Sequence, residues 1–494
     1  MRRTTGIAAA IMAAALVAGC GGESNRVSSQ AGTATPPSTA STATTSSSSA
    51  ATPVPSTGTA STSAVPPTSA TGSTASGSLP AETSASGSSA GATAATGALP
   101  GKPVKRVSYP VVGSGTPVRS SFFGMHDHTP LSWPSAPIGA VRLWDAGVTW
   151  REIETSRGSF AFGRLDRAVA TARSHGAEPL IVLGMTPSFH AKKPHAPSFY
   201  GPGASSPPKI GAWQRYVRRV VLRYGSRNVS YQVWNEANVS GFWSGSQAEM
   251  ARLTKATYDV MRAVRPGARL VAPAFVTRSA AQQRALASFY AQRPDGRPVG
   301  GLVDVVSLQL YPTPSGTPES SMQVLAADRR ILARHGVSKP IWNTEINYGL
   351  TGRPVRAKSS GIQRAYVART YLLNAASRIQ RVYWYAWDSG TITNTRMTYS
   401  SGAVGPGGVA LRVVRGWMSG QRMHSCERLK GGTYLCTLTS AGSVRRVFWN
   451  PRRTTTVGLP AGARTLSRLD GSRSSVTGNR LRVTSTPIMV QSPA

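Results

Sequence analysis

Tyr231-Gln232-Val233-Trp234-Asn235-Glu236-Ala237-Asn238 is the stretch from which the fold of this 494-residue chain can be worked out. A short, largely apolar run leads directly into polar and acidic residues, as in a buried parallel strand that ends at a site. The pattern recurs at Lys339-Pro340-Ile341-Trp342-Asn343-Thr344-Glu345. Because a carboxylate at the exit of a buried strand is costly unless it is paired or functional, both glutamates are candidate site residues.

Similar apolar runs alternate with amphipathic stretches between residues 121 and 388. The eight runs are 122–126, 140–144, 179–183, 231–234, 270–274, 303–310, 340–342 and 381–387. Apolar residues at helical spacing lie between them at 165–175, 210–224, 248–264, 280–290, 322–335 and 362–376. Eight such repeats predict an α/β fold, the (β/α)₈ or TIM barrel, in which the carboxyl ends of all strands converge on one face.

An open, doubly wound sheet is the alternative architecture, and it favours a glycine-rich phosphate turn after an early strand. The first two runs lead instead into Met125-His126-Asp127-His128 and Trp144-Asp145-Ala146-Gly147. Polar and aromatic residues recur at the ends of nearly all the runs, which favours the barrel.

Beyond Trp417 the helical periodicity gives way to short alternating runs at 433–438, 444–449, 454–459, 481–484 and 488–491. They predict a small C-terminal all-β, sandwich-like domain. We place the barrel at 101–415 and the β domain at 416–494, although the segment 404–417 fits either part.

The N-terminus reads as an export signal. Arg2 and Arg3 precede an apolar run at 7–18 that ends in Val17-Ala18-Gly19-Cys20, and small residues before a single cysteine resemble a bacterial lipobox. The resemblance implies a signal peptide at 1–19, acylation of Cys20 and an exported lipoprotein held on the cell membrane, facing outside the cytoplasm. An ordinary signal peptide with a chance cysteine is the alternative. Residues 20–100, rich in Ser, Thr, Ala and Pro, predict a disordered tether.

The other two cysteines, Cys426 and Cys436, flank a predicted hairpin that turns at 430–432. A three-residue loop at that turn places them opposite each other, and an exported protein permits the bond. We therefore predict a disulfide between them.

The formal net charge is +37, from 56 Lys and Arg against 19 Asp and Glu. Such an imbalance raises nucleic acid as a partner, but no zinc-finger spacing, basic heptad helix or RNA-binding signature is present. We interpret the scattered arginines as a solvated basic surface and expect no nucleic-acid partner. An anion-binding envelope protein remains an alternative.

Glycoside hydrolysis uses two carboxyl groups that flank one bond. Glu236 and Glu345 follow the fourth and seventh predicted strands, and opposed barrel strands hold two carboxyls on a rigid frame. The structural alternative is that both glutamates are salt-bridge partners of the many arginines. Their shared position at two strand ends favours catalysis.

With these motifs the sequence resembles the large clan of retaining glycoside hydrolases with barrel folds, and most closely glycoside hydrolase family 39 with its bacterial exopolysaccharide-cleaving relatives. The resemblance covers roughly 122–388, and it implies Glu236 as general acid/base and Glu345 as nucleophile, about 5 Å apart. The further substrate-site residues that it implies are Asn235, Arg142, Tyr311, Trp387, His126 and His128.

Aromatic residues complete the expected site. Trp243 is a candidate shield for the acid and, with Phe189 and Tyr200, a candidate lining of an elongated cleft; Trp384 is the alternative to Trp387 as the sugar platform. His126 and His128 share a strand face, but no third metal ligand has good spacing, so we expect neither metal nor cofactor.

Two departures bear on specificity. Many relatives have proline where this chain has Ala237, and tryptophan in the motif that here reads Thr186-Pro187-Ser188-Phe189. The resulting hypothesis is a monomeric, retaining glycosidase that cleaves an extracellular or cell-envelope polysaccharide. A non-catalytic, carbohydrate-binding envelope lipoprotein on the same scaffold is the alternative.

Overall fold

The computed structural model describes residues 106, 108, 115–130 and 132–494. The predicted signal peptide, the lipidation site at Cys20 and the tether lie outside the described residues. No helix in the part of the chain that the structure describes is long and apolar enough to cross a membrane.

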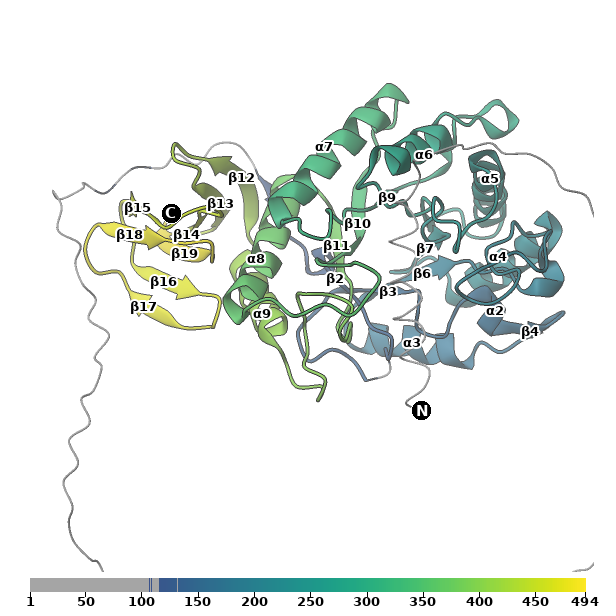
Figure 1. Ribbon diagram of the computed structural model, residues 1–494, viewed down its shortest axis with the longest axis horizontal. Helices are drawn as coiled ribbons and strands as arrows, with labels where there is room; N and C mark the ends of the chain where they lie inside the picture. Colours follow the sequence, from purple (N-terminus) through teal and green to yellow (C-terminus); the bar gives the residue numbers. More distant parts are fainter. Residues whose placement is uncertain (1–105, 107, 109–114, 131) are drawn as a thin grey trace, which may run out of the picture. The chain divides into compact units, whose positions relative to one another are not determined.

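Eight parallel strands form the barrel, in the order β8-β7-β6-β3-β2-β11-β10-β9. A parallel bridge between Val271 and Val305 joins the two ends of this order. The prediction of a (β/α)₈ barrel is therefore confirmed (Figure 1). The strands are β2 Phe123–His126, β3 Ala140–Leu143, β6 Glu178–Leu183, β7 Ser230–Val233, β8 Arg269–Val271, β9 Val306–Gln309, β10 Ile341–Ile346 and β11 Arg381–Trp384.

Helices lie outside the strands (Figure 1). They are α3 Gly163–Ser174, α4 Ile210–Tyr224, α5 Gln247–Val264, α6 Ala280–Tyr290, α7 Pro318–Arg334, α8 Ser360–Ala376 and α9 Pro406–Met418. Short elements fill the connections: η1 Ser120–Phe122, α2 Trp150–Ile153, β4 Glu154–Ser156, β5 Ser159–Phe160, η2 Ser188–His190, η3 Pro294–Gly296 and η4 Val299–Leu302. The connection from β2 to β3 contains no helix among its described residues.

Local chemistry explains where several helices begin. Ser246 caps α5 and Ser279 caps α6, each in a reciprocal capping box with the residue three positions later. The predicted bounds of α4 and α6 match the structure. Helix α7 begins at Pro318, four residues before its predicted start, because Thr317 caps it and proline suits the first helical position.

The C-terminal domain consists of antiparallel strands, as predicted. Its main sheet has the order β1-β12-β13-β14-β19-β16-β17, and β15 pairs with β18. The strands are β1 Thr116–Pro117, β12 Arg422–Arg428, β13 Tyr434–Ser440, β14 Ser443–Trp449, β15 Thr455–Gly458, β16 Thr465–Arg468, β17 Arg473–Ser475, β18 Arg480–Val483 and β19 Ile488–Pro493. β1 precedes the barrel in sequence but pairs with β12, and α9 runs across residue 415.

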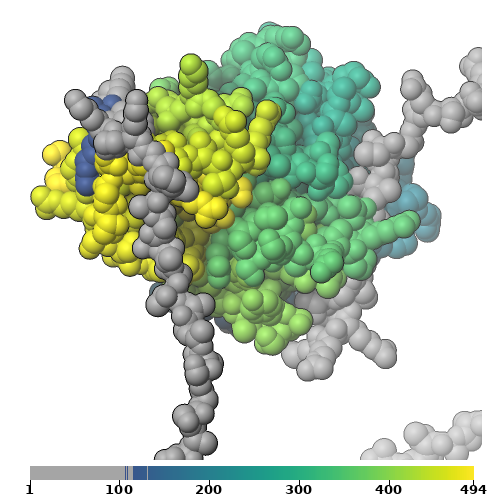
Figure 2. Space-filling view, turned by 60° about the vertical axis from the view of Figure 1, so that its left-hand side comes forward, coloured from purple at the N-terminus to yellow at the C-terminus, as the bar shows by residue number. Residues whose placement is uncertain are grey.

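Side-chain hydrogen bonds join this domain to the barrel helices. The indole of Trp449 donates to Glu319 on α7 (3.0 Å), and the indole of Trp417 on α9 donates to Ser467 (3.0 Å). Figure 2 shows the C-terminal residues, in yellow, directly against the green part of the barrel. The predicted disulfide between Cys426 and Cys436 is present and joins β12 to β13.

Candidate active site

Both motif glutamates are delivered to the same end of the barrel. Glu345 lies near the end of β10, and Glu236 follows β7 by three residues. Trp234 and Glu236 adopt left-handed backbone conformations, with φ of 65° and 44°, which turn the chain at the strand exit. The side chains of both glutamates are fully buried.

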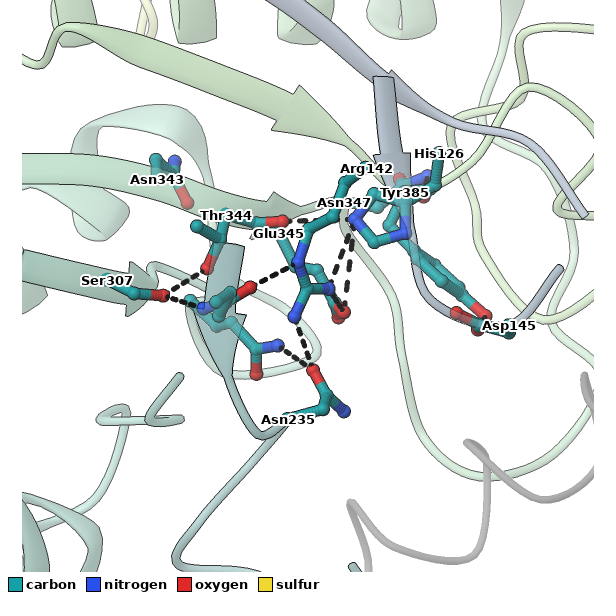
Figure 3. A network of polar contacts seen from close by, with 12 residues as sticks. His126, Arg142, Asp145, Asn235, Ser307, Asn343, Thr344, Glu345, Asn347 and Tyr385 are labelled. Carbon is teal, nitrogen blue, oxygen red and sulfur yellow. Dashed lines mark hydrogen bonds and ion pairs between the residues drawn. The ribbon is translucent and has the colours of Figure 1, made fainter. Parts of the chain in front are cut away.

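Arg142 on β3 connects the two glutamate motifs (Figure 3). Its Nη1 donates to Oε1 of Glu345 (2.5 Å), and its Nη2 donates to Oδ1 of Asn235 (2.7 Å). Its Nε donates to Oε1 of Gln232 (2.8 Å), so three of its nitrogens are held. One fixed, planar guanidinium thereby orients the carboxylate of one motif and the amide of the other.

The second oxygen of Glu345 also has a donor, because the hydroxyl of Tyr311 lies 3.0 Å from Oε2. Burial raises the pKa of Glu345 to about 7, and the charge of Arg142 opposes the rise, as does the hydrogen bond from Tyr311. The positive charge of Arg142 and the hydrogen bonds that Arg142 and Tyr311 donate favour the ionised form of Glu345. Arg142 and Tyr311 thus both hydrogen-bond to Glu345.

Glu236 has the opposite environment. Neither of its carboxyl oxygens has a hydrogen-bond partner among the described residues. Burial, and then the charge of Glu345, raises the pKa of Glu236 well above its usual range. These environments favour the protonated form of Glu236 and make Glu345 the carboxyl that ionises first. This is the division of roles that general acid catalysis by one of two carboxyls requires.

Asn235 is oriented by its neighbours. Its Oδ1 accepts hydrogen bonds from Arg142 and from Nε2 of Gln309 (2.9 Å). Since a guanidinium only donates, the oxygen must face Arg142, and the amide nitrogen points elsewhere. That nitrogen is buried and has no partner among the described residues, so it is available to donate.

The two predicted histidines differ in charge. Burial, and then the charge of Arg142, lowers the pKa of His126 to about 3, so this ring is neutral. Its Nε2 lies 3.0 Å from the carbonyl oxygen of Thr344, just before Glu345. For His128, burial lowers the pKa, but hydrogen bonds to Asp145 and Asp388 outweigh it and raise the pKa well above its usual range.

His128 belongs to a network that the sequence analysis did not identify. Its Nδ1 lies 2.6 Å from Oδ1 of Asp388, and its Nε2 lies 3.0 Å from the hydroxyl of Tyr385. That hydroxyl donates to Oδ2 of Asp145 (2.7 Å), and Figure 3 shows Tyr385 and Asp145 beside the Arg142 network. Asp145 and Asp388 follow strands β3 and β11, so a polar residue at a strand exit was the available signal.

Gln232, Ser307 and Gln309 were also not predicted as site residues. Nε2 of Gln232 donates to Oγ of Ser307 (2.6 Å), so the three side chains form a polar layer around Arg142 and Asn235. Ser307 and Gln309 are alternate residues of an otherwise apolar strand, which places them on one face. This alternation of polar and apolar residues was the feature of the sequence that could have indicated these two site residues.

Trp243 is not brought to the acid pair by any contact of the described residues. It is buried against Trp234, with ring centroids 4.9 Å apart, and its indole donates to the carbonyl of Ser246 (3.2 Å). Trp384 packs outward on Tyr371 of α8. Trp387 lies beyond the end of β11 with 8% of its surface exposed, and its backbone N–H donates to the carbonyl of His126 (2.9 Å).

The two other residues predicted to line a cleft, Tyr200 and Phe189, lie in different surroundings. Tyr200 is half-buried and packs on Trp144, which directly follows β3, with ring centroids 5.6 Å apart. Burial, and then the charges of Asp145 and Glu152, raise the pKa of Tyr200 well above its usual range. Phe189 instead lines a hollow of about 490 Å³ with Arg151 and Lys209.

One departure from the family pattern has a structural consequence. The backbone N–H of Ala237 donates to the carbonyl of Ala274 (2.9 Å), which ties the Asn235-Glu236 turn to the segment after β8. A proline has no N–H to donate and cannot make this bond. No group of three or more His, Cys, Asp or Glu side chains in the described ranges is placed to hold a metal ion.

Comparisons with known proteins agree with this geometry. The family model described as Glycosyl hydrolases family 39 matches residues 102–386. No curated protein matches the sequence significantly.

Solved structures share the fold. A family 39 glycoside hydrolase from Bacteroides cellulosilyticus has 18% identity and a TM-score of 0.60, covering 76% of this chain and 81% of that one. A monomeric beta-xylosidase from Caulobacter crescentus has 15% identity and a TM-score of 0.57, covering 76% and 97%. A family 30 endoxylanase from Clostridium papyrosolvens has 13% identity and a TM-score of 0.53, covering 78% and 98%.

The family match spans more than half of the chain, including both glutamate motifs. The chain therefore belongs to glycosyl hydrolases family 39 and is a glycosidase.

Proposed function

We propose that this glycosidase cleaves its substrate by double displacement, with net retention of configuration. The observation that carries the proposal is the contrast between two buried carboxyls. Glu345 is held by Arg142 and Tyr311, whereas Glu236 has no partner among the described side chains and a strongly raised pKa. An ionised nucleophile and a protonated acid are what the first step of this mechanism needs.

In that step the carboxylate of Glu345 attacks the anomeric carbon, and the bond from this carbon to the leaving oxygen breaks. Glu236 gives its proton to the leaving oxygen. The product is a covalent glycosyl ester on Glu345, and Glu236 is now ionised.

In the second step Glu236 takes a proton from water as the water attacks the same carbon. The ester bond to Glu345 breaks, and both carboxyls return to their initial states. The amide nitrogen of Asn235, which has no partner among the described residues, would donate to the sugar 2-hydroxyl, a contact that strengthens as charge develops at the anomeric carbon.

We further propose that the substrate is an extracellular or cell-envelope polysaccharide and that the enzyme acts as a monomer. The signal-like segment at 7–18 and the lipobox-like sequence before Cys20 support an exported lipoprotein. A polar tether of about 80 residues gives the barrel reach from a membrane to a polymer.

The catalytic proposal is tested with a panel of aryl glycosides of both anomeric configurations, followed by proton NMR of the first-formed sugar. We expect retention, and a loss of at least about 10³-fold in kcat for Glu345→Gln. Glu427→Gln, which changes an exposed glutamate in β12, serves as the matched control and should retain wild-type activity. Inverted product, or equal activity in Glu345→Gln, contradicts the mechanism.

The anchor is tested separately, by detergent extraction of membranes from cells that express the full chain. Wild-type protein should sediment with the membranes, and Cys20→Ala should be released. Unchanged membrane retention of Cys20→Ala rules out the lipid anchor and leaves the catalytic proposal untouched.

A further inference from the structure

The C-terminal β domain is strongly basic in its own right. Residues 422–493 contain twelve Lys and Arg and only two acids, Glu427 and Asp470. Such a surplus on a small domain produces a positive potential that attracts anions. The two catalytic glutamates lie in the barrel domain, so they do not account for the positive charge of the β domain.

Part of this charge surrounds a groove on one face of the main sheet. The strand register places Arg445, Gln491 and Thr465 side by side across β14, β19 and β16. The next row on the same face brings Met489, Ser467 and Arg473 together. A hollow of about 400 Å³ lies here, and none of its lining residues is acidic.

Arginine side chains lie in and beside the groove without a balancing carboxylate. Arg445 is fixed, since its Nη1 donates to the carbonyls of Gly416 (3.0 Å) and Trp417 (2.8 Å) at the end of α9. Burial, and then the charge of Arg473, lowers the pKa of Arg445, so Arg445 lies in a positive environment. Arg464 and Arg473 line the groove, are exposed and form no ion pair with any described residue.

Neutral hydrogen-bonding groups lie between the cations. Thr465 and Gln491 line the groove, and so does Ser467, whose buried hydroxyl already accepts the hydrogen bond from the indole of Trp417. Hydroxyl and amide groups beside arginines suit a ligand with both hydroxyls and a negative charge. No aromatic residue lines the groove, so it lacks the stacking surface on which nucleobases bind.

A second hollow lined by arginines lies at the opposite end of the barrel from the glutamates. It differs from the sheet groove in how its positive charges are paired. It is lined by five arginines, but Arg381 is paired with Glu178 and Arg262 with Asp304. Two of its five arginines are thus paired with carboxylates that line the same hollow, whereas no carboxylate lines the sheet groove.

We propose that the groove lined by Arg464 and Arg473 binds acidic sugar units of a glycan. The arginines would contact a carboxylate, sulfate or phosphate, and the side chains of Thr465 and Gln491 would contact the sugar hydroxyls. The groove would hold the polymer independently of catalysis, and the inference does not rest on the proposed mechanism.

The test measures binding of the full chain to immobilised polygalacturonate and dextran sulfate at about 0.15 M salt, where exposed charges are partly screened. These probes carry carboxylate and sulfate, respectively, and neutral dextran is the uncharged control. We expect the double variant Arg464→Gln/Arg473→Gln to weaken binding of at least one acidic probe about tenfold or more, which corresponds to about 1.4 kcal/mol.

The matched control is Arg422→Gln/Arg482→Gln, which removes two exposed arginines of the same domain outside the groove. Its affinity should fall less than about threefold, as expected for loss of diffuse attraction alone. Both double variants should hydrolyse small aryl glycosides like the wild type, which separates this inference from the catalytic proposal.

Equal losses in the two double variants would overturn the proposal, because the binding would then reflect net charge alone. Equally tight binding of neutral dextran would also overturn it. So would groove-dependent binding of phosphatidylglycerol vesicles or single-stranded DNA without binding of either acidic polysaccharide.

Discussion

The guanidinium of Arg142 lies 2.5 Å from the carboxylate of Glu345, although the two residues are 203 positions apart and their strands are not neighbours in the barrel. The contact therefore spans the barrel interior. It exists because inward-facing residues of β3 and β10 meet beneath the mouth, and because Gln232 holds the guanidinium from β7. The ionisation of Glu345 thus depends on a residue that is distant in the sequence and lies on a strand that does not pair with β10.

Arg142→Met removes this cation, and the pKa of Glu345 should rise. Because Glu345 must be ionised to attack, the acidic limb of the kcat/KM profile should move to higher pH. Loss of a hydrogen bond between charged groups, about 1.5–3 kcal/mol, corresponds to a roughly 10- to 100-fold decrease in kcat/KM on the acid side. Arg142→Lys retains a charge and should give a smaller shift. An acidic limb that stays in place would show that Arg142 does not control this ionisation.

Glu236→Gln removes the proposed proton donor and leaves a side chain of similar size. Substrates with poor leaving groups need protonation, so they should lose about 10²- to 10⁴-fold in rate. Aryl glycosides with very acidic phenols should lose much less in the glycosylation step. The measurement is kcat/KM across a series of phenols of graded pKa. A uniform loss across the series would argue that Glu236 is not the acid.

The sequence was sufficient to predict those parts of the fold that depend on local pattern. Apolar runs gave the eight barrel strands, and the apolar periodicity of α4 and α6 gave their bounds. Strand β12 was expected only as the first half of the cysteine hairpin, and strands β16 and β17 were not predicted, since they are short and owe their conformation to pairing with neighbouring strands.

The residues of the candidate site also differ in whether the sequence alone predicts them. Glu236 and Glu345 were identifiable because each follows a buried strand. The network of His128, Tyr385 and Asp388 was not, because His128 lies 257 and 260 positions from the other two residues and only the folded chain shows the contacts. Trp243 illustrates the reverse case, since a tryptophan near the motif packs into the core.

Asp388→Asn should lower the pKa of His128, because it removes a carboxylate that stabilises the protonated ring. A histidine with a raised pKa in the folded state stabilises the protein below the unfolded-state pKa of about 6.5, and this contribution is lost as pH rises through the folded-state pKa. The variant should therefore be less stable than wild type at pH 5, by about 1–3 kcal/mol. The difference should shrink at alkaline pH. Melting temperatures measured between pH 5 and 10 test this, and a difference that grows with pH would contradict it.

Asp328 offers a test of buried charge away from the acid pair. Its side chain on α7 is fully buried, Thr277 donates to Oδ2 (2.6 Å), and Oδ1 has no partner among the described residues. Burial raises the pKa of Asp328 from 3.8 to about 7, and the hydrogen bond from Thr277 opposes the rise. The folded protein therefore binds a proton more tightly than the unfolded chain does.

Stability should consequently fall as pH rises from about 4 to 7, because ionising the buried carboxyl is unfavourable. The full cost above pH 7 is on the order of 4 kcal/mol, from about three pKa units at 1.36 kcal/mol each. Asp328→Asn lacks this ionisation, so it should match wild type near pH 4 and be more stable at pH 8. Asp259→Asn changes an exposed carboxyl of α5 and should follow the wild-type pH profile. Melting curves of Asp328→Asn that run parallel to those of wild type from pH 4 to 8 would show that Asp328 does not titrate in this range.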